Sequence, residues 1–90
     1  RQLLAEDRRA VLVDTRSAGE YRRGTLPGSV SIPEAEIDRR APLVLRDKTA
    51  PVLVFCRTGA YSWRSAQRLA ELGYTQVYDA GGYLEWRLEV

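Results

Sequence analysis

The four consecutive apolar residues Val52-Leu53-Val54-Phe55 constrain the fold of this chain more than any other feature. A strand with one face in water alternates apolar and polar residues, whereas a strand covered on both faces, as in parallel sheets, can be apolar throughout. The run therefore predicts a central strand of a parallel sheet. It ends at Cys56, the only cysteine in the sequence.

Three further short apolar runs predict the other strands of this sheet. We expect them over Val11–Val13, ending at Asp14, over Val30–Ile32 and over Val77–Tyr78. Segments with helical patterns separate the runs, and strands joined by helices form a parallel sheet through right-handed crossovers. Ninety residues suffice for one modest core. The sequence thus predicts a single α/β domain over residues 1–90, with helices on both faces of the sheet.

Four segments between and after these runs are expected to be helical: Ala18–Arg22, Glu34–Arg40, the stretch after Ser62, and Tyr83–Leu88. Ser17 and Glu20 have the spacing of a capping box, and Gly24 marks the end of the helix that they start. In the second segment Ile37 is the expected inward residue, and Pro42 is expected to stop the helix.

The helix after Ser62 has the clearest pattern. Its apolar residues recur at spacings of three and four, which places them on one face: Trp63, Ala66, Leu69 and Ala70. Gly73 falls where a helix C-terminal glycine is expected. Gly81-Gly82 predicts a turn before the last helix, and the aromatic residues Trp63, Tyr74, Tyr78 and Trp86 are expected to pack in the core or at its rim.

The count of reactive residue types excludes several classes of protein. A single cysteine forms no internal disulfide and no CxxC redox pair. The sequence has no histidine, which argues against Cys-His catalysis and zinc chemistry. We therefore expect no metal site and no cofactor.

The charge pattern gives little sign of a macromolecular partner. The net charge is +2, and the arginine pairs Arg8-Arg9, Arg22-Arg23 and Arg39-Arg40 are dispersed among acidic residues. A nucleic-acid site would favour a basic stripe with stacking aromatics, so we expect none. No apolar stretch approaches the roughly 20 residues that span a bilayer, so we expect no membrane association. A cytoplasmic protein is expected, although position 1 is not methionine and a removed signal segment stays open.

Several motifs in order resemble the rhodanese-like sulfurtransferase domains. The front signature consists of Asp14-Thr15-Arg16, Glu20-Tyr21, Gly24, Leu26-Pro27-Gly28 and Ile32-Pro33. The loop Cys56-Arg57-Thr58-Gly59-Ala60-Tyr61-Ser62 with Ala66 resembles the active-site loop of that family, and Val77, Gly81-Gly82 and Trp86 resemble its closing segment. The resemblance implies a rhodanese-like domain with a parallel sheet of four to five strands, a nucleophilic Cys56 and a substrate-binding loop over Arg57, Thr58, Gly59, Ala60, Tyr61 and Ser62.

The chain departs from the family pattern at two positions. Thr25 stands where the family often has histidine, and Tyr61 stands at or near the place of a loop arginine. We expect Thr25 to change the chemistry little, whereas Tyr61 leaves the substrate class open. A first strand before Val11, common in the family, is not evident in the sequence.

The chemistry expected of Cys56 follows from its place between a strand and a helix start. An ordinary thiol with a pKa of about 8.5 is only about 3% thiolate at pH 7. Lowering that pKa by about 2 units needs about 2.7 kcal/mol, which exceeds the 0.3 to about 1 kcal/mol available from a helix N-terminus. Loop amides and a nearby arginine could supply the rest, with Gly59 letting the amides turn inward, and Arg57 is the expected partner of a sulfonate-like group. The alternative for a lone cysteine is a small buried hydrophobe.

A thiolate without a histidine partner suits a reaction with little proton transfer. Sulfane-sulfur transfer meets this condition: Cys56 attacks the outer sulfur of a small anionic donor such as thiosulfate, sulfite leaves, and a persulfide forms. Cyanide or an external thiol then takes the sulfur, because no other cysteine can resolve the persulfide. A sulfur-accepting protein is a further possible partner.

The other loop residues have structural alternatives. Ser62 is expected to cap the following helix first and to bind substrate second. Tyr61 could be a wall of the pocket or a packing residue, and Arg64 is expected to face solvent or pair with an acid. Asp14 and Arg16 are expected to form a charge network between loops and to take no direct part in catalysis.

Two other functions remain open. A phosphatase or arsenate reductase of related fold would need arginine six residues after the cysteine, where this chain has Ser62. Arg64 is two residues too far along. A non-catalytic binding module or a sulfur relay would recognise a protein through Tyr61, Trp63 and the arginines.

Overall fold

The computed structural model describes residues 7–86, and the side chains of residues 7–84. Its centre is a four-stranded sheet in the order β2-β1-β3-β4, in which all three neighbouring pairs are parallel. The strands are β1 (Val11–Asp14), β2 (Val30–Ser31), β3 (Val52–Cys56) and β4 (Val77–Gly82). The predicted parallel sheet is confirmed, with four strands in the described part of the chain.

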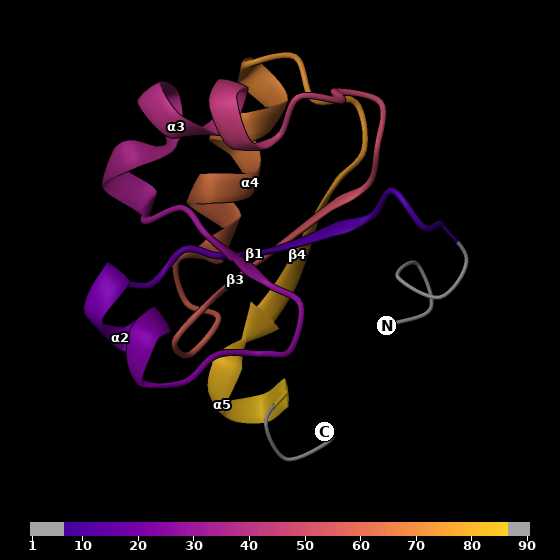
Figure 1. Cartoon of the computed structure of the whole chain (residues 1–90). Coiled ribbons are helices and arrows are strands. Elements are labelled where there is room, and N and C mark those ends of the chain that lie inside the picture. Colours follow the sequence, from indigo (N-terminus) through magenta and orange to yellow (C-terminus); the bar gives the residue numbers. More distant parts are fainter. Residues whose placement is uncertain (1–6, 87–90) are drawn as a thin grey trace.

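Helices connect the strands and follow the last one. They are α2 (Ala18–Arg23), the 3-10 turn η1 (Glu34–Glu36), α3 (Ile37–Val44), α4 (Ser62–Glu71) and α5 (Tyr83–Trp86). Figure 1 shows α3 and α4 together along one side of the sheet, whereas α2 and α5 lie toward the end to which the β4 arrow points. That end of the sheet carries the carboxyl ends of all four parallel strands.

The apolar run of β3 is buried on both faces, as predicted. Val52, Leu53, Val54 and Phe55 are each 4% exposed or less. Val52 and Val54 belong to a cluster under α3 and α4 that includes Leu69, while Leu53 and Phe55 pack on the opposite face. Alternate residues of one strand thus supply two cores, which is why the run contains no polar residue.

The opposite face is covered by few elements. Leu12, Leu26, Leu53 and Phe55 form its buried cluster, and the Tyr83 ring of α5 packs against it. The Phe55 and Tyr83 rings are stacked with their centroids 6.4 Å apart. This small cluster connects the end of β3 to α5, and it places Tyr83 beside the residues that follow β3.

The capping box at the start of α2 is present. The Ser17 hydroxyl accepts a hydrogen bond from the Glu20 N–H at 3.2 Å, and the Glu20 carboxylate accepts from the Ser17 N–H at 3.4 Å. Gly24 ends the helix, as predicted. Both ends of this short helix are therefore set by local sequence.

The prediction that Pro42 stops its helix is wrong, because α3 continues to Val44 with Pro42 inside it. Proline removes one backbone donor, but other contacts hold this turn. The Leu45 N–H donates to the Ala41 carbonyl at 2.7 Å. The Tyr74 hydroxyl lies 3.1 Å and 2.6 Å from the carbonyl oxygens of Ala41 and Leu45. Burial of Ala41, Leu45 and Tyr74 together outweighs the local preference.

The face that α4 turns toward the sheet includes Ala66 and Leu69, as predicted, but not Trp63 and Ala70. Ser62, Ser65 and Leu69 are buried, whereas Trp63 is 54% exposed and Ala70 is exposed. Two small serine side chains let the helix lie close to the sheet, and the apolar spacing did not reveal them. Of the aromatic residues expected in the core or at its rim, Tyr74 is buried and Tyr78 is 40% exposed.

Gly81-Gly82 forms the end of β4, so the prediction of a turn there is wrong. Gly82 pairs with Cys56 after a shift in register. A Cβ atom on Gly82 would lie 2.5 Å from the Thr58 carbonyl carbon and 2.9 Å from the Gly59 nitrogen. The backbone of the loop after Cys56 therefore rests directly on the backbone of β4. Gly59 has a φ of 90°, which suits glycine alone among common residues.

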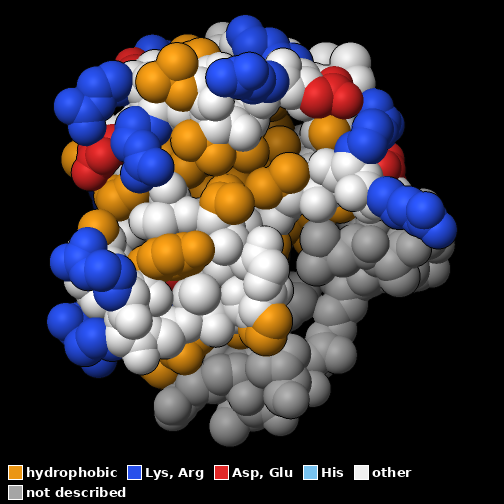
Figure 2. Space-filling view, in the orientation of Figure 1, with side chains coloured by type: hydrophobic (Ala, Val, Ile, Leu, Met, Phe, Trp, Pro, Cys, Tyr) orange, Lys and Arg blue, Asp and Glu red, His pale blue; other side chains and the backbone are white. Residues whose placement is uncertain are grey.

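Basic side chains lie around the margin of the face in Figure 2, with acidic ones between them, and form no continuous stripe on that face. No helix among residues 7–86 is long and apolar enough to cross a bilayer. The expected helix over Tyr83–Leu88 is described as far as Trp86, and the side chain of Trp86, like the region before residue 7, lies outside the described residues.

The contact at Gly82 predicts a destabilising substitution. Gly82→Ala should lower the free energy of unfolding by about 1–3 kcal/mol, because the added methyl group overlaps the backbone at Thr58. Urea unfolding measures this change. Gly19→Ala in α2 is the matched control, since its Cβ would be no closer than 3.5 Å to a neighbour, and it should stabilise by about 0.5 kcal/mol. Equal stability of Gly82→Ala and wild type would contradict the contact.

Candidate active site

Cys56 lies at the carboxyl end of β3, where it is half-buried and unpaired. Its Sγ atom accepts a hydrogen bond from the Gly59 N–H at 3.0 Å. The positive φ of Gly59 turns this amide back toward the sulfur. The alternative of a buried hydrophobe does not fit, because the sulfur contacts a polar group and reaches the surface.

Burial and hydrogen bonding act on the Cys56 thiol in opposite directions. Partial burial acts to raise its pKa, because a thiolate loses hydration. Hydrogen bonds act to lower it, from the backbone N–H groups of Tyr61, Gly59 and Thr58 and from the Ser62 hydroxyl. The hydrogen bonds outweigh burial, and the pKa of Cys56 lies below its ordinary value.

Ser62 does not cap α4, so that prediction is wrong. The helix begins at Ser62 itself, and the preceding residue, Tyr61, makes no side-chain cap. The buried Ser62 hydroxyl instead lies 2.5 Å from Oδ1 of Asp79 in β4. The same carboxylate oxygen accepts the Gly81 N–H at 2.9 Å. Asp79 thus fixes both the start of α4 and the end of β4, and its carboxylate competes with the sulfur for the single Ser62 proton.

A cavity of about 340 Å³ opens at Cys56. Eight residues line it: Thr15, Arg16, Glu20, Glu34, Cys56, Arg57, Thr58 and Tyr61. Of the residues predicted to bind substrate, Arg57, Thr58 and Tyr61 are among these. Gly59, Ala60 and Ser62 are not, since Gly59 and Ser62 lie beside the sulfur and Ala60 is exposed at the tip of the loop.

Tyr61 forms the rim of this cavity. Its side chain is 58% exposed, and the Arg64 guanidinium lies 4.6 Å from the centre of its ring. Arg64 in turn pairs with Glu34 at 3.0 Å, as expected of a residue that pairs with an acid. Tyr61 therefore fits the role of a pocket wall better than that of a packing residue. Its contact with Arg64, and the pairing of Arg64 with Glu34, also bring Glu34 from η1 to the site.

Asp14 and Arg16 form the charge network that the sequence predicts. The carboxylate of Asp14 is fully buried and pairs with the Arg16 guanidinium at 2.8 Å. Arg16 also donates to the Gly24 carbonyl at 2.6 Å, which ties the end of β1 to the end of α2. Burial acts to lower the pKa of Arg16, but Asp14 outweighs it and raises the pKa above the ordinary value. Arg16 therefore stays charged next to the cavity.

Thr25 belongs to the same network. Its hydroxyl donates to Asp14 Oδ2 at 2.8 Å and lies 2.7 Å from the Ser29 hydroxyl. Threonine, at the position where the family often has histidine, thus makes a structural hydrogen bond. That Thr25 changes the chemistry little stays a prediction.

Roles in the site for Asp79, Tyr83, Thr15 and Glu34 were not identified from the sequence. Asp79 lies within β4, whereas the other three residues follow strands, and the carboxyl ends of parallel strands meet at one edge. That rule could have indicated Thr15, which follows β1. The contact of Tyr83 with the Arg16 guanidinium, 4.0 Å from the ring centre, depends on tertiary packing.

The acidic residues of the site do not gather. Among residues 7–86 no three His, Cys, Asp or Glu side chains lie where they could hold a metal ion. The charged groups at the cavity itself are Arg16, Arg57, Glu20 and Glu34. The arrangement can therefore hold one thiolate on backbone amides and receive a small anion next to two arginines.

The chain is similar to known proteins over almost all of its length. The family model of the rhodanese-like domain matches residues 1–89. Thiosulfate sulfurtransferase PspE of Escherichia coli is 34% identical over 70 residues, which cover 78% of this chain and 67% of the relative. A human thiosulfate:glutathione sulfurtransferase is 34% identical over 99 residues, covering 96% of this chain and 85% of the relative. The match to Bacillus subtilis YqhL covers 88% of this chain but only 62% of that protein.

Solved structures show the same relationship. A rhodanese from E. coli determined with anions has a TM-score of 0.78 at 32% identity, covering 84% of this chain and 89% of the other. The human single-domain sulfurtransferase TSTD1 has a TM-score of 0.81 at 30% identity, covering 99% and 89%. These similarities confirm both the predicted fold and the predicted class of enzyme, a rhodanese-type sulfurtransferase. The motifs around Cys56, the topology of the sheet and the family model agree that this chain belongs to the family of rhodanese-like domains.

Proposed function

We propose that this domain moves a sulfane sulfur from thiosulfate, or a donor of that kind, to an external acceptor through a persulfide on Cys56. The observation that carries the proposal is the Cys56 sulfur, which accepts the Gly59 N–H at 3.0 Å and opens into a cavity beside Arg57. A thiol whose pKa is lowered by loop amides is nucleophilic at neutral pH.

The first half-reaction needs no proton transfer. The Cys56 thiolate attacks the outer sulfur of thiosulfate, a new S–S bond forms, and the bond to the sulfonate sulfur breaks. Sulfite leaves with the electron pair, and the terminal persulfide sulfur retains the negative charge. The amides that lower the pKa of Cys56 also suit this persulfide anion, since both are sulfur anions at the same place. Absence of histidine from the sequence is therefore no obstacle.

The second half-reaction uses an acceptor from outside the chain. Cyanide or a thiolate attacks the terminal sulfur, and Cys56 leaves as a thiolate. The chain has no second cysteine that could resolve the persulfide internally. The human relative named for thiosulfate and glutathione supports a small thiol as acceptor. The compartment in which this occurs stays a prediction.

The loop residues have separate parts in this proposal. Arg57 is exposed at the cavity and attracts the sulfonate group of the donor. Thr58 and Tyr61 form the adjacent walls, with Tyr61 oriented by Arg64. Gly59 supplies an amide to the sulfur, Ala60 forms the exposed tip, and Ser62 holds the loop through Asp79.

A sulfur relay to a protein partner is the second candidate. Tyr61, which lines the cavity, and Trp63 are 58% and 54% exposed on either side of Ser62. These side chains offer apolar surface to a partner that presents its own thiol. A phosphatase is not favoured, because the residue six positions after Cys56 is the buried Ser62.

Exposure to thiosulfate should add the mass of one sulfur atom to the protein, as measured by intact mass spectrometry without reductant. The adduct forms because the loop amides stabilise the persulfide anion on Cys56. The variant Cys56→Ser is the control and should show no adduct and no transfer to cyanide. Sulfur transfer by Cys56→Ser at the wild-type rate would refute the proposal.

The pH dependence of Cys56 alkylation tests the environment of the thiol. The midpoint of iodoacetamide modification should lie lower in the folded protein than in urea, where the pKa is about 8.5. The sign follows from the amides, which favour the thiolate and are lost on unfolding.

Asp79→Asn should lower this midpoint further, because it removes a nearby negative charge and leaves Ser62 a weaker acceptor than the carboxylate to compete with the sulfur. Gly81 keeps an acceptor in the asparagine oxygen. A folded midpoint at or above that in urea would contradict the role of the loop.

Replacement of Arg57 by glutamine should raise the KM for thiosulfate about fivefold, which corresponds to roughly 1 kcal/mol for a solvent-exposed charge. Steady-state transfer to cyanide measures it. Arg8→Gln is the control, since Arg8 precedes β1 at the opposite edge of the sheet and should leave the KM unchanged. An unchanged KM in Arg57→Gln would remove Arg57 from donor binding.

A further inference from the structure

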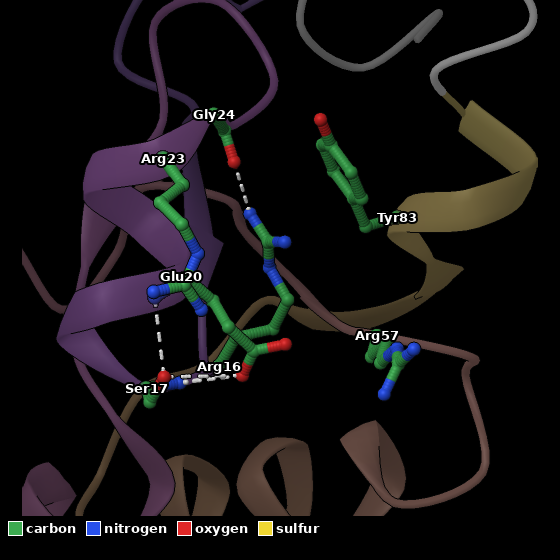
Figure 3. A pocket seen from close by; sticks show the side chains of 7 residues that line it. All are labelled: Arg16, Ser17, Glu20, Arg23, Gly24, Arg57 and Tyr83. Atoms are coloured by element: carbon green, nitrogen blue, oxygen red, sulfur yellow. Dashed lines mark hydrogen bonds between the residues drawn. The ribbon is translucent and has the colours of Figure 1, made fainter.

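A second cavity, of about 450 Å³, adjoins the one at Cys56. Figure 3 shows it between α2 and the start of α5, with the Arg57 loop on one side. Its walls are Arg16, Ser17, Glu20, Arg23, Gly24, Arg57 and Tyr83. Three of these residues, Arg16, Glu20 and Arg57, also line the cavity at Cys56. A molecule in the second cavity would therefore lie beside the reacting sulfur without occupying the donor's place.

Two arginines of this cavity have no acidic partner in the described part of the chain. Arg23 and Arg57 make no ion pair and no side-chain hydrogen bond there, and both are exposed. The other arginines at the site differ, since Arg64 pairs with Glu34 and Arg16 with Asp14. Two cations without partners on opposite walls favour an anionic ligand.

Arg16 adds a third, directed donor. The residue is 9% exposed, and its Nε and Nη2 atoms are used by Asp14 and Gly24. No hydrogen bond within residues 7–86 uses its Nη1 atom, and Figure 3 shows this end of the guanidinium beside Tyr83. A buried guanidinium held rigidly by its carboxylate partner thus keeps one nitrogen for a ligand.

Glu20 is the acidic residue that lines this cavity, and hydrogen bonds from Ser17 already stabilise part of its negative charge. Its Oε1 atom accepts hydrogen bonds from the N–H and the hydroxyl of Ser17. The charge of Arg16 is offset by Asp14, which leaves Arg23 and Arg57 against Glu20 alone. The cavity therefore keeps a net positive charge. The Tyr83 side chain also lines the cavity, and the Arg16 guanidinium lies over its ring at 4.0 Å from the ring centre.

From these observations we infer that the second cavity binds the sulfur acceptor, and that this acceptor is a thiol carrying a carboxylate. The inference rests on the proposed function of Cys56. The carboxylate lies between Arg23 and Arg57 near Arg16 Nη1, and the thiol reaches past Arg57 to the persulfide. A cavity of this size is large enough for a small organic molecule.

The transfer step balances with these two reactants alone. The acceptor thiol loses its proton to solvent, and its thiolate attacks the terminal sulfur of the Cys56 persulfide. A new S–S bond forms on the acceptor, the bond to Sγ breaks, and the electron pair returns to Sγ as the thiolate. The acceptor leaves as a persulfide, so no oxidant or reductant is required.

The test compares two acceptors that differ in charge, N-acetylcysteine and its neutral amide, in transfer from thiosulfate. The ratio of their kcat/KM values should fall about fivefold in Arg23→Gln relative to wild type, since one exposed charge is removed. Differences in intrinsic thiol reactivity cancel when ratios are compared between proteins. The loss should appear in the KM for N-acetylcysteine.

Arg22→Gln is the matched control, because Arg22 neighbours Arg23 in the last turn of α2, is exposed and lines neither cavity. It shares any loss of helix stability and should leave the ratio unchanged. An unchanged ratio in Arg23→Gln, or an equal fall in Arg22→Gln, would overturn the inference. The mass of the Cys56 persulfide, measured before acceptor is added, separates this failure from failure of the proposed function.

Discussion

The site depends on one steric constraint, the contact between the loop after Cys56 and the glycine end of β4. The loop can turn its amides toward the sulfur only where its backbone comes within contact distance of Gly82, whose missing side chain leaves that space. The register shift between β3 and β4 next to Cys56 places Gly82 there. Loop, strand end and helix start are then joined through Asp79, which accepts from Ser62 and Gly81. The geometry of the thiol thus follows from strand pairing.

The buried Asp14–Arg16 pair likewise joins the elements on the other side of the site, at the ends of β1 and α2. A buried ion pair is costly unless further hydrogen bonds satisfy it, and here Asp14 also accepts from Thr25 while Arg16 donates to Gly24. The Arg16 guanidinium also lies over the Tyr83 ring, which stacks on Phe55. Contacts therefore run from the end of β1 to α5 through a charged group. Arg16 thus contacts both the residue that ends α2 and the first residue of α5, and all three line the second cavity.

Local sequence patterns predicted the strands and the loop after Cys56. The features that were predicted wrongly depend on tertiary contacts. The apolar run Val52–Phe55 and the capping box at Ser17 could be predicted, because each depends only on residues that are neighbours in the sequence. Pro42 lies inside α3 because Tyr74, far along the chain, holds the carbonyls around it. Ser62 faces Asp79 where a capping residue was expected, and Gly82 serves close approach where a turn was expected. Each of these outcomes depends on a residue that pattern analysis cannot pair with it.

Two opposing effects set the ionisation of Cys56, in a sequence that has no histidine. Partial burial, which raises the pKa of the thiol, limits the decrease, but hydrogen bonds from the loop still lower the pKa below its ordinary value. A smaller shift has a chemical advantage, because the nucleophilicity of a thiolate falls as its pKa falls. The attacking sulfur serves best when its pKa is near the ambient pH, and the leaving sulfur when its pKa is low. In the proposed mechanism Cys56 attacks in one half-reaction and leaves in the other, so a lowered pKa helps it to leave, while partial burial limits the loss of nucleophilicity.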